Sequence, residues 1–189
     1  MRKALTGLAG PQVGADSARR GLAVAAAALV VALAAQVTVP VPPSPVPMTL
    51  QPLAVLAVGG LLGARAGAAA LVLYLGMGIA GLPVFAGGGA GIGRLFGPTG
   101  GYLLAFPVAA GVCGALAGRA PGVLRTLLAC AAGMLVIHLG GGAQLALLGG
   151  DPTLALRVGF VPFFTGDLLK IGLAAGVILA VGGRFRATH

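Results

Sequence analysis

An acid and a base, Asp167 and Lys170, lie three positions apart within a long apolar segment near the C-terminus. In a helix this spacing places both side chains on one face, about one turn apart. Ionisable groups at membrane depth are costly, and they are usually paired or functional. One interpretation is a structural ion pair, in which the two side chains bond only to each other. The other is that they form the polar floor of a site that a ligand enters from the outer side. The second interpretation is favoured, because an isolated pair could be replaced by apolar residues without loss of stability.

Four further residues could contact a ligand. Arg94 lies in a glycine-rich connection, where its guanidinium could hold a carboxylate through two parallel hydrogen bonds or contact a lipid headgroup. Thr49 and Gln51 directly follow a proline cluster at 40–47 and could hydrogen-bond a ligand beneath that stiff segment. Tyr74, inside an apolar run, is equally compatible with ligand contact and with helix packing.

The common catalytic and nucleotide-binding motifs are missing. The sequence contains no GxxxxGK[ST] loop and no GxSxG motif, and the glycine run at 87–93 fits no GxGxxG register. Asp167 is the only acid within an apolar segment, so a paired-aspartate protease would lack its second carboxylate. Cys113 and Cys130 lack metal-ligand spacing and are expected to be buried small side chains, and His138 is expected at the membrane interface. We therefore expect a protein that binds or conducts a molecule, with no catalytic residue, metal or cofactor of its own.

The composition is that of a membrane protein. Hydrophobic residues make up 58% of the 189 residues and charged residues only 8%, whereas soluble domains carry about 25% charged residues. These charges are too few to coat a soluble fold, and an apolar chain is not a disordered one. The formal net charge is +9, but the basic residues are scattered between apolar segments instead of forming a patch. We predict an all-α integral membrane protein, embedded in the lipid bilayer and without a nucleic-acid partner.

The uncharged runs, divided by the proline cluster, predict six transmembrane helices. A helix needs about 20 largely apolar residues to cross the bilayer, and lipid-exposed backbone does not tolerate a proline cluster. In this arrangement nine of the twelve Lys and Arg residues fall on one side. The positive-inside rule assigns that side, and with it both termini, to the cytoplasm. The predicted spans are 21–39, 49–63, 67–81, 101–118, 123–139 and 161–182.

The predicted spans also define the expected domains. Residues 1–20 form a cytoplasmic tail, 21–183 the six-helix membrane domain, and 184–189 a second cytoplasmic tail. The outer connections are longer than the cytoplasmic turns, and long loops gathered on one face are where a binding lid would form. These outer connections are 40–48, 82–100 and 140–160.

Pairs of small residues four positions apart recur in the predicted spans, and such pairs let helices approach closely in lipid. The alanine-rich face of the first span, including Ala28 and Ala32, would suit docking to another membrane subunit. In a chain this rich in Ala and Gly, some pairs also arise by chance. The glycine pairs are Gly59 with Gly63, Gly114 with Gly118, and Gly172 with Gly176.

Four segments, taken in chain order, resemble the motifs of a known family. They read PVPPSPVPMTLQPLAVL at 40–56, GLPVFAGG at 81–88, GPTGGY at 97–102 and GDLLK at 166–170. Over about residues 20–183 the chain is similar to BioY proteins, the biotin-specific substrate-binding (S) components of energy-coupling factor (ECF) transporters. Several motifs in the same order make the resemblance highly specific.

The resemblance implies a six-helix subunit that captures biotin with high affinity at its outer side, in the cytoplasmic membrane of a prokaryote. It also implies partners, namely a transmembrane coupling subunit and a pair of cytoplasmic ATP-binding-cassette ATPases that would bind ATP. It supports the first span as the docking surface. The alternative is a stand-alone secondary transporter of biotin or another small carboxylate vitamin. Such a transporter should show internal repeats, and the sequence has no convincing repeat.

Biotin carries groups that match these residues. Its ureido ring has two N–H donors and a carbonyl acceptor, and its valerate tail ends in a carboxylate. Asp167 would accept from a ureido N–H while Lys170 donates to an oxygen, and Arg94 could hold the carboxylate. Which cation meets which end of biotin stays open. The thiophane ring would pack against Phe85, Phe163 or Phe164.

Asp167→Asn and Lys170→Ala test the expected ligand floor. Each should weaken biotin binding by about tenfold or more, because each removes a hydrogen bond to a charged group, worth about 1.5–3 kcal/mol. Calorimetry or radiolabelled biotin with the purified protein in detergent would measure this. Unchanged affinity in both variants would remove these residues from the site.

Overall fold

A computed structural model of the chain describes residues 13–118 and 122–186. Within them, the α-helices alternate with short 3-10 turns and one two-stranded antiparallel ribbon. The strands are β1 (Thr38–Val39) and β2 (Met48–Thr49), and the turns are η1 (Ala86–Gly88), η2 (Ile92–Leu95) and η3 (Val161–Phe163). The helices are α1 (Val13–Ala34), α2 (Gln51–Leu62), α3 (Ala64–Ile79), α4 (Gly100–Ala117), α5 (Val123–Gly149), α6 (Pro152–Gly159) and α7 (Phe164–Arg186).

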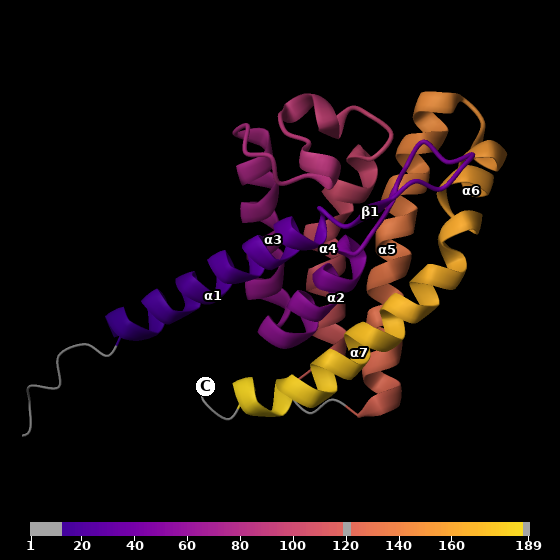
Figure 1. Cartoon of the computed structure of the whole chain (residues 1–189). Helices are drawn as coiled ribbons and strands as arrows, with labels where there is room; N and C mark the ends of the chain where they lie inside the picture. Colours follow the sequence, from indigo (N-terminus) through magenta and orange to yellow (C-terminus); the bar gives the residue numbers. More distant parts are fainter. Residues whose placement is uncertain (1–12, 119–121, 187–189) are drawn as a thin grey trace, which may run out of the picture.

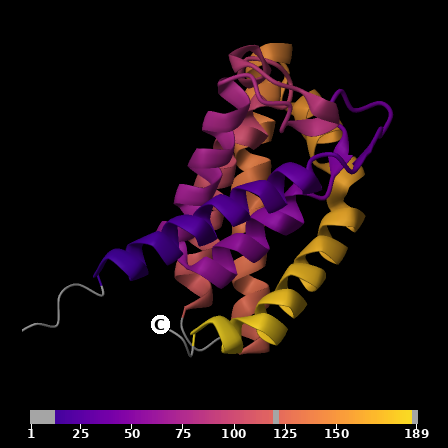
Figure 2. The same cartoon turned by 60° about the vertical axis from the view of Figure 1, so that its left-hand side comes forward.

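The helices form a bundle around the antiparallel pair α4 and α5, which lie side by side (Figure 1). α2 and α3 pack on α4, α7 packs along α2 and α5, and α1 crosses α3 and α2 (Figure 2). The connection 80–99, the end of α5 and α6 gather at one end of the bundle, and the segment 35–50 reaches toward it. We call this the loop end.

Four stretches of the described chain are long and apolar enough to cross a membrane: 16–34, 100–117, 123–149 and 152–182. α2 and α3 are also apolar but have only 12 and 16 residues. At 1.5 Å per residue they are about 18 and 24 Å long, less than the ~30 Å hydrocarbon core. They meet at Gly63, whose φ of +81° breaks the helix. This left-handed conformation favours glycine because it carries no Cβ.

Each of the six predicted spans overlaps one of the helices α1 to α5 and α7, but the ends differ. The first predicted span, 21–39, is helical only to Ala34, and its last two residues form β1. α5 continues to Gly149, ten residues beyond the predicted span, and α6 lies in the connection that was expected to be a loop. The Asp151 side chain caps α6 by accepting from the Thr153 and Leu154 amides, at 2.8 and 3.2 Å. Residues 13–20 and 184–186 of the expected tails are helical, and the rest of those tails lies outside the described residues.

In two of the three glycine pairs, one glycine, Gly59 or Gly114, takes part in close packing. A Cβ on Gly59 would collide with the backbone of Ala110, and one on Gly114 would lie 2.5 Å from the Ala64 nitrogen, so α2, α3 and α4 touch through backbone. In lipid, the hydrophobic effect does not drive helices together, so helix association depends on van der Waals contacts such as these. A Cβ on Gly172 or Gly176 would meet nothing within 4 Å, so that pair makes no such contact.

The predicted docking face at Ala28 and Ala32 is wrong. Both alanines belong to the chain's own core, where 0% and 7% of their surface is exposed and where α1 packs against α3 and α2. The exposed apolar side chains of α1 include Leu22, Leu29 and Leu33. Small residues permit close approach to any helix, so their spacing could not distinguish a neighbour in the same chain from a partner subunit.

Gly114→Ala should therefore lower the thermal stability of the purified protein, while Gly172→Ala should leave it unchanged or slightly higher. The first substitution overpacks a backbone contact, which typically costs about 1–3 kcal/mol. The second fills open space and improves helix propensity. Thermal unfolding in detergent would compare the two alanines. Equal effects would show that Gly114 does not serve close packing.

Candidate functional site

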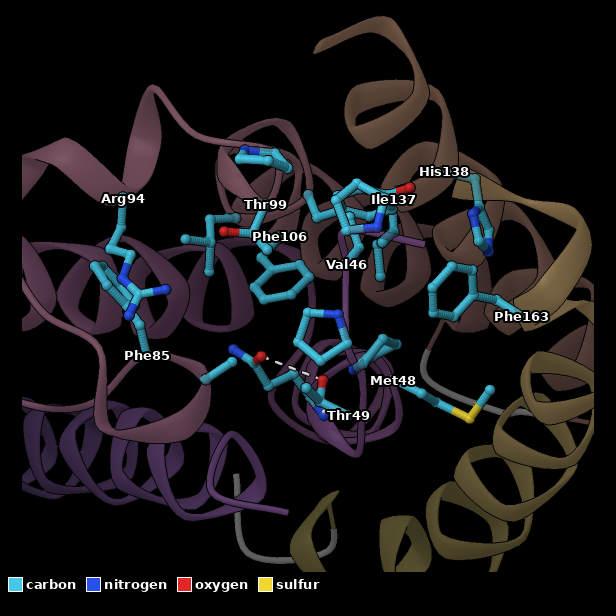
Figure 3. Close-up of a pocket in the computed structure, with 18 of the residues that line it drawn as sticks. Val46, Met48, Thr49, Phe85, Arg94, Thr99, Phe106, Ile137, His138 and Phe163 are labelled. Carbon is cyan, nitrogen blue, oxygen red and sulfur yellow. Dashed lines mark hydrogen bonds between the residues drawn. The ribbon is translucent and has the colours of Figure 1, made fainter. Parts of the chain in front are cut away.

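A cavity of about 220 Å³ lies at the loop end. Residues from the segment 45–52, the turn 93–99 and helices α4, α5 and α7 form its wall. Figure 3 shows Arg94 and Phe85 on one side of the cavity and His138 and Phe163 on the other. The middle of the wall is apolar, with Val46, Phe106 and Ile137 among the lining residues.

Asp167, Lys170 and His138 form one buried group on this wall, the polar cluster. Lys170 Nζ lies 3.1 Å from Asp167 Oδ1, and His138 Nε2 lies 2.6 Å from Asp167 Oδ2. At most 10% of each side chain is exposed. The prediction that Asp167 and Lys170 share one helix face is confirmed. Because each carboxylate oxygen has a charged or polar partner, the cost of burying Asp167 is offset within the cluster.

The prediction that His138 is an interfacial side chain is wrong. Its ring stands edge-on to Tyr102 and Phe160, with ring centres 6.2 and 4.9 Å away, and its Nε2 contacts Asp167. Nδ1 is buried and is the one such side-chain nitrogen or oxygen without a hydrogen-bond partner in the described residues. Asp167 comes 29 positions later on another helix, so local sequence gave no sign of this pairing. The only available signal was a histidine in an otherwise apolar run.

Gln51, Thr49 and Tyr74 form a hydrogen-bonded chain. Thr49 Oγ1 donates to Gln51 Oε1 at 3.2 Å, Gln51 Nε2 donates to the Tyr74 hydroxyl at 2.6 Å, and that hydroxyl donates to the Val84 carbonyl at 3.1 Å. Thr49 and Gln51 line the cavity, whereas Tyr74 lies behind them and is fully buried. The chain fixes the orientation of the Gln51 amide and anchors the start of the 82–99 connection.

Arg94 lines the cavity from η2, on the opposite side from His138 of the polar cluster (Figure 3). Its guanidinium lies against Gly89, where a Cβ would come within 2.8 Å of Cζ. The guanidinium makes no hydrogen bond or ion pair with any described residue. An unpaired guanidinium on a cavity wall can accept an anionic group.

Of the three phenylalanines predicted to pack against the ligand, two line the cavity and one does not. Phe85 and Phe163 line the cavity, whereas Phe164 does not and is 52% exposed. Sequence reasoning missed Tyr102 and Phe106, which α4 places on the wall. Apolar walls with a few placed polar groups are typical of small-molecule sites.

The remaining candidates give no second site. Cys113 and Cys130 are buried, as predicted, with their sulfur atoms 3.9 Å apart between α4 and α5. Within residues 13–118 and 122–186, no three His, Cys, Asp or Glu side chains gather where they could hold a metal.

Comparison with known proteins places this geometry in one family. The BioY family profile matches residues 4–187. The chain is 39% identical over 133 residues to the probable biotin transporter BioY of Pyrococcus horikoshii, covering 70% of this chain and 77% of that protein. It is 39% identical over 131 residues to the biotin transporter BioY of Thermotoga maritima, covering 69% and 78%.

A solved structure has the same fold. It is the crystal structure of the S-component for biotin from an ECF-type ABC transporter. Its TM-score is 0.83 at 22% identity, with 90% of this chain and 94% of that chain covered. The solved structure shows the fold; the family profile over residues 4–187 and the relatives at 39% identity establish that this chain belongs to the BioY family.

Proposed function

We propose that this chain is the biotin-binding membrane subunit of an ECF-type uptake transporter. The observation that carries the proposal is a cavity with a buried polar cluster on one side, an unpaired arginine on the other and an apolar wall between them. Membership of a family whose curated relatives are biotin transporters supports it. The activity is capture of a ligand, not catalysis of a reaction.

The ureido ring of biotin binds at the polar cluster. A cyclic urea presents an N–H donor beside a carbonyl acceptor, and Asp167 Oδ1 and Lys170 Nζ present an acceptor beside a donor, 3.1 Å apart. A carboxylate has about four lone-pair sites, so Asp167 can accept a ureido N–H while it keeps Lys170 and His138. Because the cluster is already paired, the ligand adds a hydrogen bond without leaving a bare charge in the bilayer.

The carboxylate of biotin binds at Arg94. The ring then lies at one side of the cavity and the valerate chain runs along the apolar wall, past residues such as Ile137 and Phe106. The guanidinium has no competing anion among the described residues, and it matches a carboxylate in a two-bond geometry. This orientation assigns the ureido ring to the polar cluster and the carboxylate to Arg94, a choice that the sequence leaves open.

Membrane topology and partners complete the proposal. The six helices of the predicted spans cross the cytoplasmic membrane with both termini inside, supported by the positions of the basic residues. The loop end then faces outward, where biotin enters. ATP is bound by partner ATPases that act through a transmembrane coupling subunit. Uptake that is lost when those ATPases are removed would distinguish this arrangement from a stand-alone transporter.

Equilibrium binding tests ligand and orientation together. The purified protein in detergent should bind biotin at about one per chain, and a derivative without the intact ureido ring should not compete. Arg94→Ala should weaken biotin binding by about tenfold or more, since a charge-assisted pair is lost. It should leave binding of the neutral biotin methyl ester within about twofold, because the ester has no charge to lose. Arg157→Ala, at an exposed arginine outside the cavity, is the control.

No biotin binding by folded wild-type protein would refute the proposed substrate. Equal losses for biotin and the ester in Arg94→Ala would refute the orientation, because the ester lacks the charge that Arg94 recognises.

His138 gives a second test, at the ring end. His138→Phe keeps an aromatic ring but removes the Nε2 partner of Asp167, so biotin and its methyl ester should both bind about tenfold more weakly. His138→Gln retains an amide nitrogen close to the position of Nε2 and should recover most of the affinity. Calorimetry on both variants measures the difference. Unchanged affinity in His138→Phe would exclude a role for this contact in binding.

A further inference from the structure

The connection 82–99, which we call the Arg94 segment, is held by side chains from helices α3 and α5 and from the turn that follows α1. The amide of Gly88 donates to Gln36 Oε1 at 3.1 Å, and Tyr74 of α3 holds the Val84 carbonyl. Gln144 of α5 holds the far end of the segment, beside Arg94. The Arg94 guanidinium itself contacts no polar partner among the described residues. Its position therefore depends on the backbone that carries it.

Gln144 makes two hydrogen bonds to that backbone. Its Nε2 donates to the carbonyl of Leu95 at 2.8 Å and to that of Gly97 at 2.7 Å. A side-chain amide has two N–H donors, so both are used. The two carbonyls lie on either side of Phe96, and the first belongs to the residue after Arg94. This pair of bonds fixes the end of η2 to α5 across 49 positions of sequence.

The start of α4 is shaped to let Gln144 reach the segment. A Cβ on Gly100 would collide with the Leu95 carbonyl and lie 2.6 Å from Gln144 Nε2, and a Cβ on Gly101 would lie 2.7 Å from Gln144 Cβ. Two consecutive residues without side chains thus leave space for one amide. A Cβ on Gly101 would also collide with the backbone carbonyl of Gly140, so the same glycine lets α4 and α5 approach closely at the point where Gln144 reaches the segment.

We propose that Gln144 is a positioning residue for Arg94 and thereby sets the affinity for the carboxylate of the ligand. Gln144 fixes the backbone on the C-terminal side of Arg94, while the guanidinium lies on Gly89 and faces the cavity. Without the two hydrogen bonds, η2 is no longer linked to Gln144 of α5, and the Arg94 guanidinium moves among several positions. An arginine held in place loses less freedom on binding than a mobile one, which raises affinity. The inference rests on the proposed function, because it assigns Arg94 to the biotin carboxylate.

A purely structural role for Gln144 makes a different prediction. Loosening the whole loop end would weaken every ligand of the cavity to a similar extent. Displacing Arg94 alone weakens only ligands with a carboxylate. Biotin and biotin methyl ester separate the two cases, because they share the ring and the chain and differ in the charge.

Gln144→Met removes both donors and keeps a side chain of similar length. The variant should bind biotin about tenfold more weakly than wild type and biotin methyl ester within about twofold, measured by calorimetry in detergent. In an Arg94→Ala background, Gln144→Met should have no further effect on biotin, since the group it positions is gone. Leu147→Met, one turn further along α5 at an exposed site, is the matched control and should bind both ligands normally.

Gln144→Asn covers the case in which the methionine variant does not fold. It keeps the amide but is one methylene shorter, so it cannot reach both carbonyls, and it should give the same selective loss. Equal losses for both ligands, or no loss for either, would overturn the inference. If wild type and Leu147→Met bind biotin and Arg94→Ala weakens it while both Gln144 variants do not, only this inference fails. If wild type does not bind biotin, the proposed function fails instead.

Discussion

The carboxylate of Asp167 is buried in a bundle that has little polar surface, and its charge must be compensated inside the protein. Lys170 supplies a cation from the same helix and His138 a donor from α5. The requirement for both partners ties α7 to α5 at the level of the cavity. The three side chains of the polar cluster therefore hold one another in place at the cavity wall.

Close packing positions the other walls. Gly59 and Gly114 let α2, α3 and α4 approach to backbone contact, and Gly101 does the same between α4 and α5. At the loop end, the backbone amides and carbonyls of the connections need partners. Three side chains provide them: Gln36 from the turn after α1, Tyr74 from α3 and Gln144 from α5. The result is a cavity with one wall set by helix packing and another set by a few side-chain hydrogen bonds.

Residues whose role is expressed in local spacing could be found from sequence. Asp167 and Lys170 are one helical turn apart, so their shared face followed from the helix period alone. His138 and Gln144 could not be found this way, because their partners are 29 and 47 or more positions distant. Ala28 and Ala32 were misassigned for the same reason. A small residue indicates that some helix comes close, and only the packed structure identifies that helix.

The sequence by itself determined the class of the protein, the approximate position of six of its helices, and the ligand chemistry suggested by its motifs. These depend on hydropathy, helix period and short patterns, which are properties of neighbouring residues. The tertiary structure alone decided that α5 extends to Gly149, that α6 occupies a connection, and that Arg94 and the polar cluster face one cavity from opposite sides. Those features arise from contacts between distant segments, whose energies depend on which helices meet and not on the residues next in the chain.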